Sequence, residues 1–260
     1  MRAISLAKFE EGIVNEDAAI AKEELIAVSD GAGGGGVFAE RWSQYLVDHL
    51  TDNPIKSYKE FDKWIDGIWE PFYDECEEEA KKIGGLFLNK FYDEGSFATL
   101  VSVWKNGMWI SYGDSVAFCY NRKTKELQHS FTRLADFNKP PYLINCKDPL
   151  NEEGFRNGQF KIDDDCLFFA ASDTLAHYIL MMYEMTREDQ YEEELKEAIS
   201  AQTKNSNFIK AAMRLRKRDF SKDVIQKLEN CKYENQLISH IGRLKRWGFI
   251  GHDDYSLAIL

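Results

Sequence analysis

The stretch Leu25-Ile26-Ala27-Val28-Ser29-Asp30-Gly31-Ala32-Gly33-Gly34-Gly35-Gly36 contains a short apolar run, one aspartate and a glycine-rich segment. A run of this length is typical of a buried strand, and the glycines indicate a turn that ends it. Residues 38–50 follow with apolar side chains at helical spacing. The stretch therefore predicts a strand, a tight turn and a helix. It leaves the Asp30 carboxylate at the end of the strand, where an unpaired charge is costly.

The rest of the chain contains helices and strands in separate blocks. Residues 57–83 have apolar and aromatic side chains at spacings of three and four, which predicts a long helix bent at Pro71. Residues 132–158 hold three prolines and are expected to form a loop, whereas 174–247 are expected to be mostly helical. The expected strands lie within 2–29 and at 97–104, 108–112, 116–120, 127–131, 160–162, 166–171 and 255–260. Because the blocks do not alternate, we predict an α+β fold with antiparallel sheets.

Composition limits the function classes. The 260 residues are 44% hydrophobic and carry a net charge of −11, which fits a single globular domain and argues against a nucleic-acid-binding face. No stretch approaches the roughly 20 apolar residues of a membrane span, and no signal peptide is evident. The five cysteines are scattered without a C-x-x-C pair, as expected for reduced thiols of a cytoplasmic protein.

Several aspartates occur where expected strands begin or end. Asp30, Asp114 and Asp173 each follow an apolar run, and Asp253 and Asp254 precede the last one. Any one of them alone is most simply a turn or helix cap. Several carboxylates that converge would repel one another unless cations neutralise them, and hard oxygen ligands suit Mg²⁺ or Mn²⁺. The set as a whole therefore predicts a divalent-metal site.

The order of short motifs along the chain resembles a known family. The motifs are Asn15-Glu16-Asp17, Val28-Ser29-Asp30-Gly31-Ala32-Gly33-Gly34, Gly95-Ser96-Phe97-Ala98, Gly113-Asp114-Ser115, Ala171-Ser172-Asp173 and Asp253-Asp254-Tyr255-Ser256. Each is weak alone, but the ordered set spans residues 15–256 and resembles a divergent bacterial-type member of the metal-dependent serine/threonine phosphatases of type 2C, the PPM family.

The resemblance implies both a fold and an activity. The fold would be a four-layer α-β-β-α sandwich over 1–260, with a helical and flap segment within about 174–250. The activity would be hydrolysis of phosphoserine or phosphothreonine on proteins by a water activated between metal ions. The implied partners are a phosphorylated protein substrate and a cognate serine/threonine kinase, with no nucleic acid and no membrane.

The resemblance also implies a role for each matched position. Asp30 would bridge two Mg²⁺ or Mn²⁺ ions, and the Gly31 carbonyl would bind the second. Asp173 and Asp253 would hold the first, Asp17 would bind metal-bound water, and Asp114 with Asp173 would form a weaker third site. Asp30, Asp173 and Asp253 are thus the expected catalytic residues.

This sequence departs from the family pattern at several positions. Gly12 stands where members have an arginine that grips the substrate phosphate, and Lys8 and Arg2 are candidates to replace it. The other departures are Ala32, Phe97, Val116, Thr174 and Asp254. None removes an implied metal ligand.

Three other functions compete with this interpretation. The glycine-rich turn after a strand also fits a nucleotide-binding loop, but Asp30 would then face the pyrophosphate and the later aspartates would have no role. The missing arginine is consistent with a catalytically weak regulatory protein of the same fold. A phosphatase for a small phosphorylated molecule would differ only in its substrate.

Overall fold

Two five-stranded antiparallel sheets form the centre of the protein. The computed structural model describes residues 1–215 and 217–260. One sheet has the order β1-β12-β11-β7-β8 and the other β10-β6-β5-β3-β2, and β4 pairs with β9 separately. The strands are β1 (Arg2–Leu6), β2 (Ala18–Ala21), β3 (Leu25–Ser29), β4 (Phe97–Ala98), β5 (Leu100–Trp104), β6 (Met108–Tyr112), β7 (Val116–Asn121), β8 (Leu127–His129), β9 (Ile144–Asn145), β10 (Phe155–Gln159), β11 (Cys166–Ala171) and β12 (Tyr255–Ile259).

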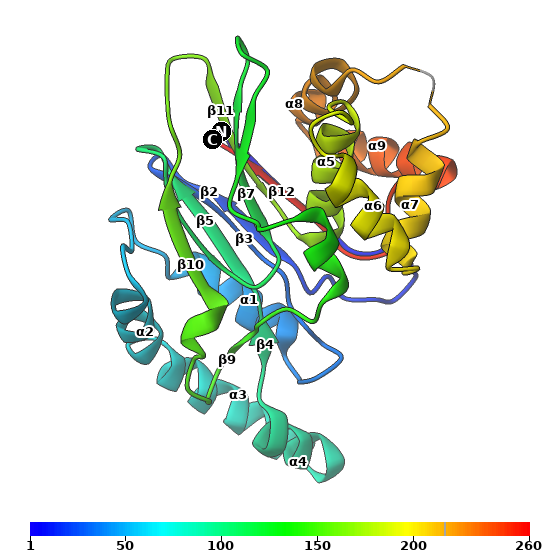
Figure 1. Cartoon of the computed structure of the whole chain (residues 1–260). Helices are drawn as coiled ribbons and strands as arrows, with labels where there is room; N and C mark the ends of the chain where they lie inside the picture. Colours follow the sequence, from blue (N-terminus) through cyan, green and yellow to red (C-terminus); the bar gives the residue numbers. More distant parts are fainter. Residues whose placement is uncertain (216) are drawn as a thin grey trace.

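Helices cover the outer face of each sheet. Those before β4 pack on the β10–β2 sheet, and those after β11 pack on the β1–β8 sheet (Figure 1). They are α1 (Ala39–Asp48), α2 (Tyr58–Asp66), α3 (Trp69–Ile83), α4 (Gly85–Glu94), α5 (Asp173–Met185), α6 (Glu192–Ser200), α7 (Lys204–Ala212), α8 (Gln226–Asn230) and α9 (Glu234–Trp247), with short helical turns at Leu134–Asn138, Glu152–Gly154 and Ser221–Ile225. The predicted four-layer α-β-β-α sandwich is confirmed.

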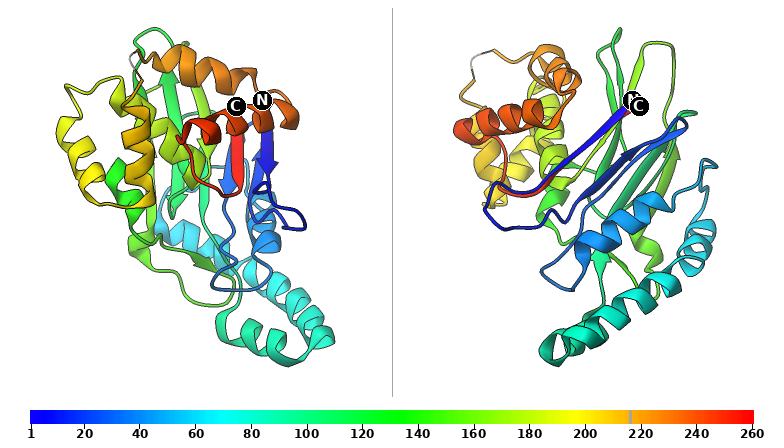
Figure 2. Two further views of the ribbon diagram at one scale, coloured as in Figure 1. Left: turned by 90° about the vertical axis from the view of Figure 1, so that its right-hand side faces the viewer. Right: turned by 180° about the vertical axis from the view of Figure 1, so that it is seen from behind.

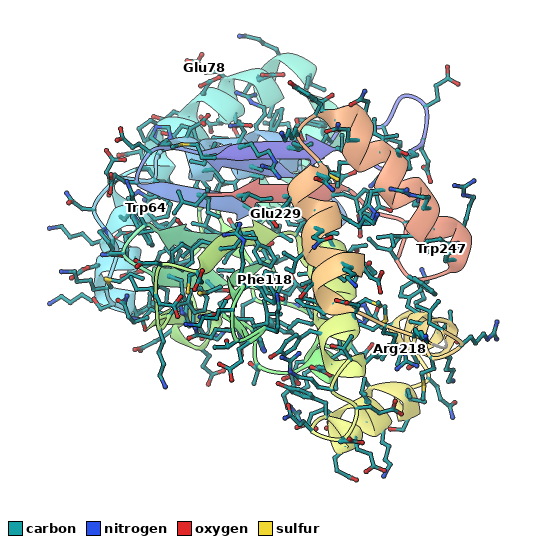
Figure 3. The ribbon with its side chains drawn as sticks, turned by 90° about the horizontal axis from the view of Figure 1, so that it is seen from above. Trp64, Glu78, Phe118, Arg218, Glu229 and Trp247 are labelled. Atoms are coloured by element: carbon teal, nitrogen blue, oxygen red, sulfur yellow. The ribbon has the colours of Figure 1, made fainter. Side chains whose placement is uncertain are left out.

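Three apolar cores hold the four layers together. Each helical layer has its own core against one sheet, and a smaller third core lies between the sheets. The inner core is built from short side chains such as Val28, Val101 and Ala258, so the sheets can approach closely. Seen from above, α8 and α9 lie on the opposite side of the strands from α3 (Figure 3). The two chain ends lie together because β1 pairs with β12 (Figure 2).

The predicted helix over 57–83 is two helices, and Pro71 does not bend it. The break falls between α2 and α3, where Gly67 ends α2 and Ile68 leaves helical geometry. Pro71 is the third residue of α3. Backbone N–H groups in the first helical turn have no partner within the helix, so proline is tolerated there.

Two other predictions need correction. The strand expected at 160–162 is instead β10, which ends at Gln159 and pairs with β6 within the segment expected to be loop. Its polar side chains lack the alternation that marks a strand, so only the pairing reveals it. Helix α4 begins at Gly85, directly after Gly84, and was not predicted.

The five cysteines form no disulfide among the described residues. Cys76, Cys119, Cys146 and Cys231 are buried free thiols, and Cys166 is partly exposed. Within residues 1–215 and 217–260, no helix has the length and apolar character needed to span a membrane.

Candidate functional site

The predicted aspartates meet at one edge of the two sheets. Asp17 and Asp30 flank the register pair Ala18–Ser29 of β2 and β3, so they lie at the same end of these strands. Asp114 lies in the turn between β6 and β7, and Asp173 is the first residue of α5, separated from the end of β11 by Ser172. Asp253 precedes β12, the neighbour of β11. Strand pairing therefore brings together residues separated by more than 200 positions in the sequence.

Electrostatics show how close these carboxylates are. Burial raises the pKa of Asp30 well above its ordinary value, and the charges of Asp17, Asp173, Asp114 and Asp253 raise it further. Burial and the charge of Asp253 raise the pKa of Asp173 to about 6. Burial and the charge of Asp173 raise the pKa of Asp114 to about 8. The site thus concentrates negative charge that the protein itself does not neutralise.

The spacing of the carboxylates is looser than that of a closed metal site. Within 1–215 and 217–260, no three His, Cys, Asp or Glu side chains are close enough to hold one ion. The donor chemistry nevertheless fits a hard divalent cation, because the converging groups are all carboxylates. Asp17 adds a further indication, since its buried Oδ2 atom has no hydrogen-bond partner among the described residues.

Gly31 is required by its surroundings. A Cβ atom at this position would lie 2.4 Å from the Glu16 carbonyl oxygen and 2.8 Å from that of Ala39. Its N–H donates to the Glu16 oxygen at 3.1 Å. Only glycine allows this close approach of two backbones, which fixes the chain directly after Asp30.

Thr99 positions the Asp30 backbone, a role that the sequence motifs did not indicate. The Thr99 N–H donates to the Asp30 carbonyl at 2.8 Å, and the Asp30 N–H donates to Thr99 Oγ1 at 3.2 Å. The same hydroxyl is 2.8 Å from the hydroxyl of buried Ser115. Ser115 directly follows Asp114, so one buried pair of hydroxyls links the segments that carry Asp30 and Asp114.

Asp254 acts as a clamp on the segment before β2. Its Oδ1 accepts the Lys8 N–H at 2.6 Å and its Oδ2 accepts the Glu16 N–H at 2.7 Å. The side chain is buried. In the sequence, Asp254 stood out as a departure from the family pattern. The structure shows instead that both carboxylate oxygens hold the loop that leads to Asp17.

Arg156 is a second residue that the sequence analysis missed. It lies on β10, and its Nη2 donates to the Gly113 carbonyl at 2.7 Å while Nη1 donates to Thr132 Oγ1 at 2.9 Å. Its positive charge lowers the pKa of the neighbouring Asp114, against the larger effect of burial. No motif marks it, because β10 itself was expected to be loop.

Gly12 and its two suggested replacements, Arg2 and Lys8, are not positioned as the missing arginine was expected to be. Gly12 is exposed and has a φ of 78°, with no atom within 4 Å of the position that a Cβ would take. Arg2 donates to the carbonyls of Leu228, Glu229 and Cys231 at the C-terminal end of α8. Lys8 Nζ lies 3.9 Å from Glu16 Oε2. Arg2 is therefore not available to bind a substrate, and Lys8 already faces a carboxylate.

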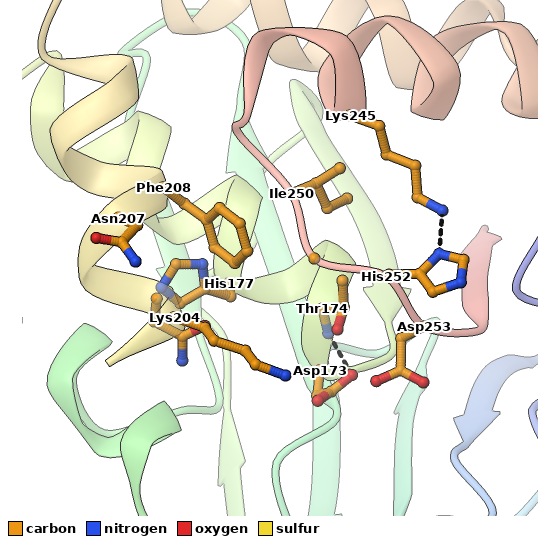
Figure 4. Close-up of a pocket in the computed structure, with 12 residues that line it drawn as sticks. Asp173, Thr174, His177, Lys204, Asn207, Phe208, Lys245, Ile250, His252 and Asp253 are labelled. Atoms are coloured by element: carbon orange, nitrogen blue, oxygen red, sulfur yellow. Dashed lines mark hydrogen bonds between the residues drawn. The ribbon is translucent and has the colours of Figure 1, made fainter. Parts of the chain in front are cut away.

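A cavity of about 600 Å³ opens beside Asp173 and Asp253. Its walls come from the start of α5, the start of α7 and the segment after α9 (Figure 4). Lys204, Phe208, Lys245 and His252 line it, together with the buried His177. Of the predicted site residues, only Asp173 and Asp253 line this cavity.

Raised carboxyl pKa values predict a pH effect on the metal-free protein. Folded Asp114 binds its proton up to about pH 8, whereas the unfolded residue releases it near 3.8. The folded state therefore holds more protons, and stability is lost as pH rises. Buried His177 acts in the opposite direction, but only below its ordinary pKa of 6.5. Between pH 6.5 and 8, each such carboxyl group should lower the unfolding free energy in chelator by on the order of 1 kcal/mol per pH unit.

Denaturant titrations at several pH values check this prediction, with Asp114→Asn as the comparison. The variant should show a shallower decline, because its amide does not titrate. Glu184, whose pKa burial raises to about 8, contributes the same slope to both proteins and cancels. Equal slopes in the two proteins would contradict the assignment.

The Asp254 clamp predicts a pattern of amide hydrogen exchange. Asp254→Asn keeps one acceptor oxygen, so one of the Lys8 and Glu16 amides should exchange faster while the other keeps its protection. Asp254→Ala should expose both amides. The Thr99 amide, which donates to the Asp30 carbonyl, serves as the internal reference. Unchanged exchange at Lys8 and Glu16 in Asp254→Ala would refute the clamp.

Comparison with known proteins identifies the fold. No family model and no curated protein matches the sequence. The catalytic domain of the serine/threonine protein phosphatase PstP, solved with two manganese ions, matches at 15% identity and a TM-score of 0.53, over 99% of this chain and 95% of that one. A Mycobacterium tuberculosis structure of PstP/Ppp matches at 15% identity and a TM-score of 0.52, over 99% of this chain and 96% of that one. A point variant of a bacterial serine phosphatase matches at 12% identity and a TM-score of 0.50, over 99% of this chain and 95% of that one. The chain therefore has the fold of the bacterial PPM-type serine/threonine phosphatases.

Proposed function

We propose that the protein is a metal-dependent phosphatase that hydrolyses phosphoserine or phosphothreonine on proteins. The observation that carries the proposal is the group of partly buried aspartates whose charges raise one another's pKa at the edge of the two sheets. Such a group is unfavourable unless cations bind it. The fold of PstP, a phosphatase solved with two manganese ions, supports both the metal and the reaction class.

In this proposal Asp30, Asp173 and Asp253 hold Mg²⁺ or Mn²⁺, with the Gly31 carbonyl as an additional ligand. Asp17 and Asp114 complete the set, Asp17 by binding water of the ion and Asp114 at a weaker third site. Divalent cations at such a site lower the pKa of water and neutralise phosphoryl oxygens. The protein contributes position: Thr99 fixes the Asp30 backbone, and Asp254 fixes the loop before Asp17.

Protein substrates are favoured by the form of the site. Asp173 and Asp253 lie at the wall of an open cavity, not in a closed chamber that would select a small molecule. A phosphorylated segment of another protein, made by a serine/threonine kinase, could approach from this side. A small phosphorylated molecule remains the second candidate, and a phosphopeptide compared with small phosphate esters separates the two.

A catalytically weak protein of the same fold is the remaining alternative. The observation in its favour is that no three described carboxylates are close enough to share an ion. Metal binding would have to draw them together. Turnover with metal therefore distinguishes an enzyme from a regulatory protein that kept only the fold.

The test is hydrolysis of p-nitrophenyl phosphate and of a phosphothreonine peptide with added Mn²⁺. Activity should disappear in excess chelator, and Asp30→Asn should lower it by about a hundredfold or more, because the shared ligand is lost. Asp74→Asn, the same change at an exposed position on α3, should leave activity unchanged. Full activity in chelator would exclude the proposed mechanism.

Metal should also stabilise the fold, since it binds only the assembled site. Calorimetric scans with and without Mn²⁺ should give a higher melting temperature for wild type and Asp74→Asn, with most of that gain lost in Asp30→Asn. An equal gain in all three proteins would show that Mn²⁺ binds elsewhere.

A further inference from the structure

Lys204 occupies a distinctive place beside the proposed metal site. It is the first residue of α7, and its side chain extends across the cavity towards Asp173 (Figure 4). Lys204 and Asp173 line the same cavity, yet their charged atoms do not form an ion pair within 4 Å. A group that carries negative charge and fits between them would meet Lys204 on one side and the carboxylate site on the other.

The other cations around the site are already engaged. Lys245 Nζ lies 2.5 Å from His252 Nδ1 and over the Phe9 ring at 4.6 Å, and His252 Nε2 in turn lies 2.6 Å from Glu10 Oε1. The other positively charged candidates also have partners in the protein. Arg2 binds carbonyls at the end of α8, and Lys8 lies near Glu16. Lys139 pairs with Asp136, and Arg156 binds Gly113 and Thr132.

Lys204 differs from all of these. Among residues 1–215 and 217–260 it has no hydrogen-bonded, ion-paired or aromatic partner for its ammonium group. Lys204 is exposed, as unpaired lysines usually are, but it also lines the cavity that contains Asp173 and Asp253. Within the described part of the chain, its charge is therefore available to a ligand at these carboxylates.

The backbone that carries Lys204 is held in place. Thr203 caps α7 by accepting from the Ser206 N–H, and its hydroxyl donates to Asn138 Oδ1 at 2.5 Å. Ser206 Oγ donates to the Ala198 carbonyl of α6 at 2.7 Å. The start of α7 is therefore tied to α6 and to the turn at 134–138. The Lys204 ammonium group has no such contact among the described residues.

His177 gives independent evidence that the cavity takes a polar ligand. Its ring is only 4% exposed and lines the cavity beside Phe208. Its buried Nε2 atom has no hydrogen-bond partner among the described residues. A buried polar atom without a partner is costly, and a ligand or water in the cavity would satisfy it.

We propose that Lys204 binds the phosphoryl group of the substrate and so replaces the arginine that is absent at Gly12. This inference rests on the proposed phosphatase function. An ammonium group forms charge-assisted hydrogen bonds with phosphate oxygens, although it lacks the two-pronged geometry of a guanidinium. Lys204 reaches the site from α7, whereas Gly12 lies in the loop between β1 and β2. The substrate phosphate therefore lies between Lys204 and the cations proposed at Asp173 and Asp253.

The experiment measures phosphate binding and turnover in Lys204→Met, which removes the charge and keeps most of the side-chain length. With Mn²⁺ present, the dissociation constant of inorganic phosphate, from calorimetric titration, and the KM for a phosphothreonine peptide should each rise about tenfold or more, with kcat changed less. Lys204→Arg should keep both constants within about threefold of wild type. Lys210→Met, on the same helix but outside the cavity, should match wild type.

Several outcomes would overturn the inference. Unchanged phosphate affinity in Lys204→Met would do so, as would a weakening in Lys8→Met that Lys204→Met does not show. A raised peptide KM with normal phosphate affinity would mean that Lys204 contacts another acidic group of the substrate. Loss of turnover in wild type would refute the proposed function. The calorimetric phosphate titration would still decide the role of Lys204, because it requires no catalysis.

Discussion

Repulsion among partly buried carboxylates is the constraint on which this site depends. Asp30 is surrounded by the charges of Asp17, Asp114, Asp173 and Asp253, and burial removes much of the water that would screen them. A fold keeps such carboxylates close together only if the backbone that carries them is held firmly and if a bound cation can offset their repulsion. Both sheets provide the first condition, because each of these residues lies within two positions of a hydrogen-bonded strand.

Polar side chains beside the aspartates supply the remaining rigidity. The hydroxyls of Thr99 and Ser115 connect the two segments that carry Asp30 and Asp114. Asp254 uses both carboxylate oxygens to hold the loop before Asp17. These groups are buried and satisfied, so they fix positions without adding flexibility. The aspartates themselves remain incompletely paired, since the buried Asp17 Oδ2 atom has no hydrogen-bond partner among the described residues.

Most of the positively charged side chains named near the site bind other groups of the protein and are not free to bind a ligand. Arg2 and Arg156 bind backbone carbonyls, and Lys245 joins a chain through His252 to Glu10. Such contacts stabilise the edges of the fold but leave little charge for a ligand. Among the described residues, Lys204 is the cation near Asp173 that has no such partner, and it comes from a helix outside the ordered motifs. We therefore relate the absence of an arginine at Gly12 to the presence of Lys204 on α7.

The sequence alone predicted the fold class and the identity of the converging aspartates, because both follow from local signals. Apolar runs indicated β3, β11 and β12, and the aspartates beside these runs indicated the candidate site. Helices α2 and α3 merged in the prediction because their apolar spacing continues across Gly67, and β10 was missed because its strand character comes only from pairing with β6. The contacts of Thr99, Arg156 and Asp254 and the place of Lys204 beside Asp173 were decided by tertiary structure alone. Each acts through atoms distant in sequence, and a hydrogen bond or a shared cavity between distant segments leaves no periodic pattern in the chain.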